Sequence, residues 1–316
     1  MSTQRTHPVA LAHGIARFDF LTDSFKLRSQ HLFGPIFDDI ILHLSEHGIR
    51  VTKDRLHYFR GILSFLEENG FDVHHTRVSF AHGLETRAND LKNQINNILG
   101  LTGADRVHVI AHSMGGLDAR FMIARLGMAD KVASLTTIGT PHLGTSFADH
   151  KLARGGTELI ELVSKAIDLR GFSDLSRAAC QKFNESVRNA EATNDVFYQT
   201  YSSSEERKQI FTFLQLSWDI INKEEGANDG LVPVTSQAWQ TVLTADDGST
   251  KNVLQKQFPL PADHLNQVGW WDLNELHGFG KLNPIGSRMR FENEIKKVYL
   301  SIARDLRERF RIAPDN

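Results

Sequence analysis

The sequence predicts an α/β protein in which a mostly parallel sheet is covered by helices on both faces. Short apolar runs alternate with amphipathic segments between residues 8 and 140, which is the pattern of repeated strand–helix–strand units. A further amphipathic segment, residues 291–310, is long enough to close the sheet as a helix. With 316 residues, 41% of them hydrophobic, the chain can bury one large core, and we expect a single domain over residues 1–316.

The predicted elements follow one another in a regular order. Strands are expected at residues 8–12, 71–78, 105–110, 132–138 and 210–216. Helices are expected at residues 55–69, 88–99, 117–126, 157–169, 175–189 and 291–310. Gly70 and Gly100 stand where two of these helices should stop. Residues 189–208 are polar and rich in turn-forming residues, so we expect turns there.

Ser113 stands between a predicted strand and a predicted helix, in the segment Ala-His-Ser-Met-Gly-Gly of residues 111–116. Ala111 and Gly115 are the small residues that a tight strand-to-helix turn needs around a nucleophilic serine. Such a turn lifts the hydroxyl above the sheet and points the Met114 N–H toward an anion that forms beside it. A turn serine without function is the alternative, but the strand before it and the helix after it favour a nucleophile.

A second N–H donor for that anion is predicted at Ile15. The first strand ends at His13-Gly14, and a glycine at the carboxyl end of a central strand permits a turn that presents backbone amides to the site. Ile15 and Met114 would together form an oxyanion hole. His82-Gly83 is a competing pair, but it comes after a later strand.

The acid that would complete a catalytic triad should follow Ser113, because the order on this type of sheet is serine, acid, histidine. Asp229 lies in an Asn-Asp-Gly turn after the predicted strand 210–216, and the turn can direct its carboxylate inward. Asp219 is the alternative, because it lies closer to the end of that strand.

The base should also follow Ser113, and four of the fifteen histidines do: His142, His150, His264 and His277. His264 lies in a loop after an apolar run and is the predicted base. His277 lies in a later turn and is the main alternative, while a solvated surface imidazole is possible for each of them.

Two segments interrupt the alternation of strands and helices. Residues 17–52 are rich in Phe and Leu, and we expect an insertion near the entrance of the site or a surface excursion. Residues 145–208 are expected to form a helical lid or cap. In this second segment an apolar stripe on one helical face is formed by Leu159, Ile160, Val163 and Ile167. The stripe would either cover the substrate site or simply pack on the core.

Taken in order, these motifs resemble those of the bacterial triacylglycerol lipases of the pseudomonad type, which have the α/β-hydrolase fold. The likeness runs from Pro8 to about Val268 and includes the segments 11–14, 58–62, 70–73, 111–116, 139–144, 228–232 and 263–265. It implies a triad of Ser113, Asp229 and His264. It further implies amide donors at Ile15 and Met114, and a lid within residues 145–208.

The chain departs from this family in its cofactor and redox features. Cys180 is its single cysteine, whereas the family usually carries a disulfide. The family's calcium site uses an acidic residue two positions after the catalytic histidine and an amide residue further on, where this chain has Asn266 and Trp270. We therefore expect no metal site and no required cofactor, with calcium left open.

Charge and hydropathy narrow the choice of partners and compartment. The net charge of −2 gives no reason to expect a nucleic-acid partner. No apolar run approaches about 18 residues, so no transmembrane segment is expected. The polar first seven residues leave no room for a signal peptide, which points to the cytoplasm, with leaderless secretion as the alternative.

The sequence thus predicts a serine carboxylic-ester hydrolase, and the resemblance implies a lipase that hydrolyses acylglycerol esters through an acyl-enzyme. Its expected partner is an ester lipid, with contact at the surface of lipid droplets or membranes. The alternatives are an esterase for polyester or phospholipid esters, because a triad is silent on the leaving group, and a hydrolase-fold binding module without catalysis.

Overall fold

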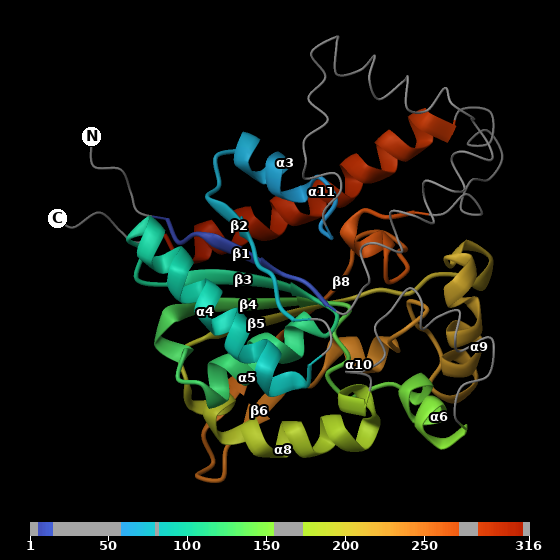
Figure 1. Ribbon diagram of the computed structural model, residues 1–316, viewed down its shortest axis with the longest axis horizontal. Helices are drawn as coiled ribbons and strands as arrows, with labels where there is room; N and C mark the ends of the chain where they lie inside the picture. The colour runs from blue at the N-terminus through green and yellow to red at the C-terminus, as the bar shows by residue number, and fades with distance from the viewer. Residues whose placement is uncertain (1–5, 15–57, 80–81, 155–172, 272–283, 312–316) are drawn as a thin grey trace.

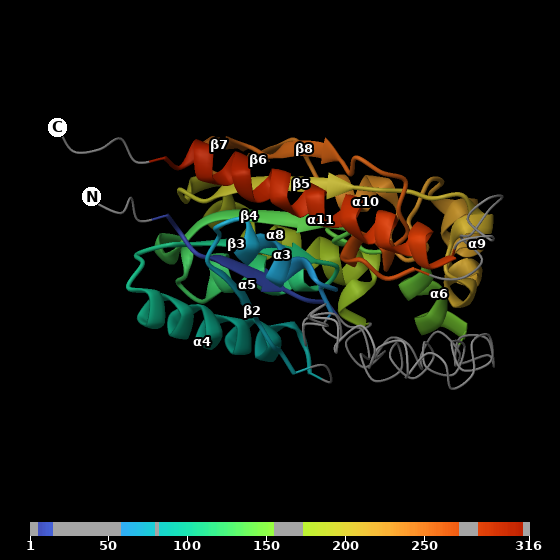
Figure 2. The ribbon, with the colours of Figure 1, turned by 90° about the horizontal axis from the view of Figure 1, so that it is seen from above.

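The central sheet has six strands in the order β2-β1-β3-β4-β5-β8, and every neighbouring pair is parallel. The computed structural model describes residues 6–14, 58–79, 82–154, 173–271 and 284–311 (Figure 1). The strands are β1 (Val9–Ala12), β2 (Val73–His75), β3 (Val107–His112), β4 (Val132–Ile138), β5 (Phe197–Ser202) and β8 (Leu254–Gln257). Seen from above, they follow one another across the molecule from β8 to β2 (Figure 2). The predicted α/β class is confirmed.

Helices cover both faces of the sheet. Figure 1 shows α3 (Ile62–Glu68) and α11 (Pro284–Arg309) on one face, and α4 (Leu84–Thr102), α5 (Gly115–Arg125) and α8 (Arg177–Thr193) on the other. Alternate residues of β1 supply the two cores, because successive side chains of a strand point to opposite faces. Val9 and Leu11 pack with α3 and α11, whereas Ala10 and Ala12 pack with α4 and α5.

Smaller elements complete the described part of the chain. They are the helices α6 (Ser146–Arg154), α9 (Gln215–Glu224) and α10 (Val234–Ala238), the antiparallel pair β6 (Val242–Thr244) and β7 (Thr250–Asn252), and 3₁₀ turns at Ala129–Lys131, Arg207–Gln209, Thr212–Leu214 and Asn266–Val268. Within those same residues, no helix combines the length and the apolar character that crossing a membrane requires.

The predicted strands at 8–12, 71–78, 105–110 and 132–138 are confirmed as β1 to β4, but the strand predicted at 210–216 is wrong. A 3₁₀ turn and the start of α9 occupy that segment, and its apolar residues Ile210 and Leu214 are buried against neighbouring loops. The missing strand is β5, which lies in the polar segment 189–208.

The polar strand β5 is stable in the sheet because its side chains are paired. Gln199 and Thr200 are almost completely buried, and the Gln199 amide donates a hydrogen bond to the Thr136 hydroxyl on β4 at 2.8 Å. Burying a polar side chain is inexpensive when it is hydrogen-bonded, so hydropathy alone does not reveal such a strand.

The position of β5 also corrects the boundary of the predicted lid. Residues 197–202 belong to the central sheet, so an insertion over residues 145–208 is too long at its carboxyl end. The apolar stripe of Leu159, Ile160, Val163 and Ile167 lies outside the described residues, as does the segment 17–52. The lid and the insertion near the entrance therefore stay predictions.

Candidate active site

Ser113 lies in a strained turn between β3 and α5. Its φ of +57° falls in the left-handed region, which residues other than glycine rarely adopt. The turn is tight because the start of α5 packs against the end of β1: a Cβ atom added at Gly115 would lie 2.6 Å from the His13 carbonyl oxygen. The small residue two positions after Ser113 is therefore required by contact with the neighbouring strand.

The structure brings the side chains of Ser113, His264 and Asp229 together. The His264 Nε2 atom is 2.8 Å from Ser113 Oγ, and the His264 Nδ1 atom is 2.8 Å from Asp229 Oδ2. All three residues are buried, with Asp229 completely excluded from solvent. A carboxylate only accepts hydrogen bonds, so His264 carries its proton on Nδ1, and Nε2 accepts from the Ser113 hydroxyl.

The turn around Asp229 orients its carboxylate. The Oδ1 atom accepts hydrogen bonds from the backbone N–H groups of Leu231 at 3.0 Å and Val232 at 2.8 Å. Asn228 closes the same turn, because its side-chain oxygen accepts from the Gly230 N–H at 2.8 Å. Oδ2 is thereby directed to His264.

The loop that carries His264 is held by the adjacent carboxylate of Asp263. This carboxylate accepts from the backbone N–H groups of Leu265 at 2.9 Å, Asn266 at 2.8 Å and Phe211 at 2.7 Å. Burial, together with the charge of Asp229, raises the pKa of Asp263 to about 7. The His264 backbone N–H also donates to the Asp229 carbonyl oxygen at 2.8 Å, which joins the two loops directly.

The described alternatives to Asp229 and His264 lie elsewhere. Asp219 is exposed on α9 and forms an ion pair with Arg207, with 2.6 Å between the carboxylate and Nε. His142 is buried, stacks on Trp239 with ring centroids 4.7 Å apart, and is hydrogen-bonded to Thr137. His150 pairs with Glu224, and His277 lies outside the described residues.

The two predicted amide donors differ in what the structure shows. Met114 lies at the N-terminus of α5, and no group in the described part of the chain accepts a hydrogen bond from its N–H. Ile15 lies outside the described residues. Its neighbour Gly14 packs against the nucleophile, because a Cβ atom there would lie 2.9 Å from Ser113 Oγ.

Sequence reasoning missed a second group of polar side chains behind the triad. Tyr58, His112 and Gln267 are buried and form hydrogen bonds that reach Asp229. His112 and Tyr58 lie within the segments 111–116 and 58–62 that the sequence analysis had already named, and Gln267 follows the segment 263–265 closely.

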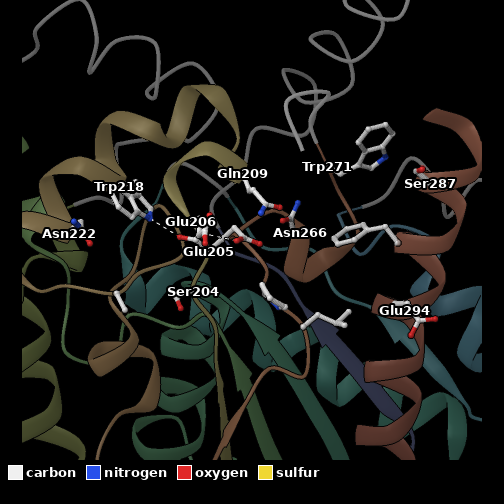
Figure 3. Close-up of a pocket in the computed structure, with 14 residues that line it drawn as sticks. Ser204, Glu205, Glu206, Gln209, Trp218, Asn222, Asn266, Trp271, Ser287 and Glu294 are labelled. Atoms are coloured by element: carbon white, nitrogen blue, oxygen red, sulfur yellow. Dashed lines mark hydrogen bonds between the residues drawn. The ribbon is translucent and has the colours of Figure 1, made fainter. Parts of the chain in front are cut away.

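A cavity of about 760 Å³ adjoins the His264 loop. Figure 3 shows Trp218 and Asn222 of α9 on one side and Ser287 and Glu294 of α11 on the other, with Glu205 between them. Asn266 contributes to its lining, but none of the triad side chains does. The cavity is thus a neighbour of the triad and is not the space directly above Ser113.

Asn266 stands where the lipase family has an acidic calcium ligand, and its side chain is hydrogen-bonded within the His264 loop. Its side-chain oxygen accepts from the Asp263 backbone N–H at 3.1 Å, and its side-chain nitrogen donates to the Trp270 carbonyl oxygen at 2.9 Å. Both polar atoms therefore stabilise the loop, and calcium favours sets of oxygen ligands that include carboxylates.

Comparison with known proteins finds a serine esterase family and several triacylglycerol lipases. The family described as "Putative serine esterase (DUF676)" matches residues 47–244. Triacylglycerol lipase 2 of Saccharomyces cerevisiae is 28% identical to this chain, over 95% of the chain and 91% of the yeast protein. Triacylglycerol lipase of Vibrio cholerae is 31% identical over 48% of the chain, and that of Pseudomonas fragi is 38% identical over 35% of it. Each of these two matches covers 38% of the bacterial protein.

Solved structures show the same fold. The mature form of the Bacillus licheniformis lipase BlEst2 aligns with a TM-score of 0.57 at 15% identity, covering 84% of this chain and 87% of the lipase. The metagenomic carboxyl esterase MGS0156 aligns with a TM-score of 0.62 at 14% identity, covering 98% of this chain and 77% of the esterase.

Proposed function

The chain belongs to the serine esterase family DUF676 and has the α/β-hydrolase fold, and we propose that it hydrolyses acylglycerol esters with Ser113 as nucleophile. The observation that carries the proposal is the continuous hydrogen-bonded line from Ser113 Oγ through both nitrogens of His264 to Asp229 Oδ2, at 2.8 Å for each contact. This line has the order and polarity that nucleophilic catalysis by a serine requires.

The reaction would proceed through an acyl-enzyme. His264 takes the hydroxyl proton of Ser113 as Oγ attacks the ester carbonyl carbon, and the carbonyl oxygen becomes an oxyanion that the Met114 and Ile15 N–H groups bind. Asp229 stabilises the imidazolium. His264 then donates the proton to the leaving alkoxide, and a water molecule that the same His264 deprotonates releases the acid.

The relatives support an acylglycerol as the substrate. The yeast relative, which the chain matches almost from end to end, is a triacylglycerol lipase by name. The match to the Pseudomonas fragi lipase, at 38% identity over 35% of this chain, supports a relation to lipases of the pseudomonad type. The substrate would be bound at the surface of a lipid droplet or membrane, with the predicted lid stripe in contact with acyl chains. The single cysteine, buried Cys180, suits a reducing compartment such as the cytoplasm, which cell fractionation would test.

Replacing Ser113 tests the proposal. Ser113→Ala should lower kcat/KM for p-nitrophenyl butyrate and for an emulsified long-chain triacylglycerol by about 10⁴-fold, because triad losses have costs of this order. Its melting temperature should stay close to that of the wild type. Ser186→Ala, at an exposed position of α8, should keep full activity and serves as the matched control.

Active-site labelling separates catalysis from mere binding. A fluorophosphonate should label the wild type and Ser186→Ala but not Ser113→Ala. A folded wild type that is neither labelled nor active would be a binding module, and activity retained in Ser113→Ala would refute the proposed nucleophile.

A further inference from the structure

We propose that Gln267 is a positioning residue that fixes the Asp229 carboxylate for His264, and that His112 and Tyr58 hold the Gln267 amide in the required orientation. The inference rests on the proposed function, because it assigns a role relative to the triad. It concerns residues that do not touch the reacting atoms and act through Asp229.

Gln267 contacts the triad at the Oδ2 atom of Asp229. It lies on the 3₁₀ turn Asn266–Val268, is completely buried, and donates from Nε2 to Asp229 Oδ2 at 3.0 Å. The same oxygen accepts from His264 Nδ1 at 2.8 Å. The two donors on Oδ2 and the two backbone donors on Oδ1 together fix the plane of the carboxylate.

The direction of each further hydrogen bond follows from the carboxylate, which cannot donate. Since the amide nitrogen of Gln267 faces Asp229, its oxygen faces His112, whose Nε2 atom lies 3.1 Å away and must donate. A neutral imidazole has one N–H group, so His112 Nδ1 is an acceptor. The Tyr58 hydroxyl, 2.7 Å from Nδ1, therefore donates to it.

The protonation state of His112 agrees with this direction. Burial lowers the pKa of His112 well below its ordinary value, and the nearby His264 lowers it further. The two rings are close, with centroids 4.5 Å apart. An uncharged His112 is also what the reaction needs, because a second cation would oppose formation of the His264 imidazolium.

The backbone leaves room for this amide at Gly139, which follows β4. Gly139 has a φ of +59°, and a Cβ atom there would lie 2.2 Å from Gln267 Oε1 and 3.3 Å from Asp229 Oδ2. A side chain at residue 139 would therefore displace the contact between Gln267 and Asp229. On the other side, the Tyr299 hydroxyl donates to the Gln267 carbonyl oxygen at 3.0 Å and anchors its backbone.

The Gln267→Met variant removes both hydrogen bonds while nearly keeping the volume of the side chain. With one donor fewer on Oδ2, the Asp229 carboxylate is less well positioned and attracts a proton on His264 more strongly. We expect kcat/KM for p-nitrophenyl butyrate to fall about 10- to 100-fold, as small misplacements of catalytic groups do. The acid limb of its pH profile should move to higher pH by about half a unit or more.

The Gln267→Glu variant gives a sharper signature, since it is nearly the same size as the wild type. While protonated, the introduced carboxyl can still donate to Asp229, and the adjacent charge should raise its pKa. When it ionises, the donor is lost and two carboxylates face each other. We expect activity near that of the wild type at low pH and a new limb on the basic side where activity falls.

The comparison must be made against the wild-type profile, because several titratable groups surround Gln267. They are Asp229, Asp263, His112, His264, Tyr58 and Tyr299. The matched control is Gln199→Met on β5, which removes a buried amide that donates to Thr136. It should lower the melting temperature and leave the shape of the pH profile unchanged.

Two results would overturn the inference. One is a Gln267→Met enzyme that loses only thermal stability, as Gln199→Met should. The other, decisive even if Gln267→Met does not fold, is a Gln267→Glu enzyme with the wild-type profile. Both leave the proposed function intact, whereas retained activity in Ser113→Ala would refute the proposed function itself.

Discussion

Two neighbouring acids show how the same side chain acquires different tasks from its hydrogen-bond donors. The Oδ1 atom of Asp229 accepts hydrogen bonds from its own turn, and the Oδ2 atom accepts from His264 and Gln267. Among the described residues, the Asp263 carboxylate accepts from backbone N–H groups, two in its own loop and one at Phe211. The first carboxylate therefore orients the imidazole, and the second holds the loop that carries it.

Asn266 leads to a prediction about calcium. Because both polar atoms of its side chain are hydrogen-bonded within the His264 loop, we propose that activity does not depend on calcium. Ester hydrolysis and the melting temperature should be unchanged, within about 20% and about 1 °C, after treatment with EDTA. A loss of rate that calcium restores and magnesium does not would contradict this proposal.

The helix α5 begins directly after the turn that contains Ser113, and buried ion pairs anchor it to the two helices beside it, α4 and α8. Asp118 on α5 pairs with Arg87 on α4 at 2.6 Å. Arg120 on α5 pairs with Glu191 on α8 through two contacts of 2.7 and 2.8 Å, and its guanidinium stacks on Trp239. These pairs fix where the helix N-terminus lies relative to the sheet.

The pair of Arg120 and Glu191 should be costly to break and less costly to replace. Glu191→Gln leaves a buried guanidinium without its counter-charge, so the free energy of unfolding should fall by about 3 kcal/mol. The double variant Arg120→Met with Glu191→Leu should lose less, because neither charge remains buried. Urea denaturation measures both, and a double variant less stable than Glu191→Gln would contradict the argument.

The described core as a whole contains several histidines that burial keeps neutral. Burial lowers the pKa of His108 to about 3 and that of His13 to about 4, and it lowers the pKa values of His112 and His142 well below their usual value. In the unfolded chain these groups take up a proton near pH 6.5. The folded state therefore binds fewer protons below that pH, and its stability falls on acidification.

His108 permits a direct test away from the triad. Its ring lies on β3 and is hydrogen-bonded to Ser134 at 2.8 Å. The contribution of His108 to the free energy of unfolding is fully present above pH 6.5 and is lost as the pH falls toward 3. The loss between pH 7.5 and pH 5.5 amounts to about 1.4 kcal/mol. His108→Gln should reduce the pH dependence of the unfolding free energy by this amount, measured by urea denaturation at both pH values.

The control is His82→Gln, which replaces an exposed histidine. It should leave the difference between the two pH values as it is in the wild type. An unchanged difference in His108→Gln would show that His108 takes up its proton in the folded state as readily as in the unfolded chain, which contradicts a lowered pKa.

Local signals in the sequence were sufficient for the first four strands, for the turn at Ser113 and for naming Asp229 and His264, whose side chains lie in line with Ser113 in the structure. Apolar runs, glycines at strand ends and the order of residues along the chain depend on neighbours in sequence, so they can be interpreted without a structure. The argument for Asp229 nevertheless relied on a strand at 210–216 that does not exist. Its order in the chain and its turn were the correct parts of that argument.

Which polar residues are paired depends on contacts between distant segments, and this is where sequence reasoning failed. The strand β5 was missed because its residues are polar, and the group that stabilises Gln199, the Thr136 hydroxyl, lies on another strand. Gln267 appears unremarkable because its partners His112 and Asp229 are 155 and 38 residues away. The α/β class and the turn at Ser113 could be predicted from the sequence, since both arise from local periodicity and turn geometry. The network behind the triad depends on contacts between distant segments, which form only when the sheet assembles.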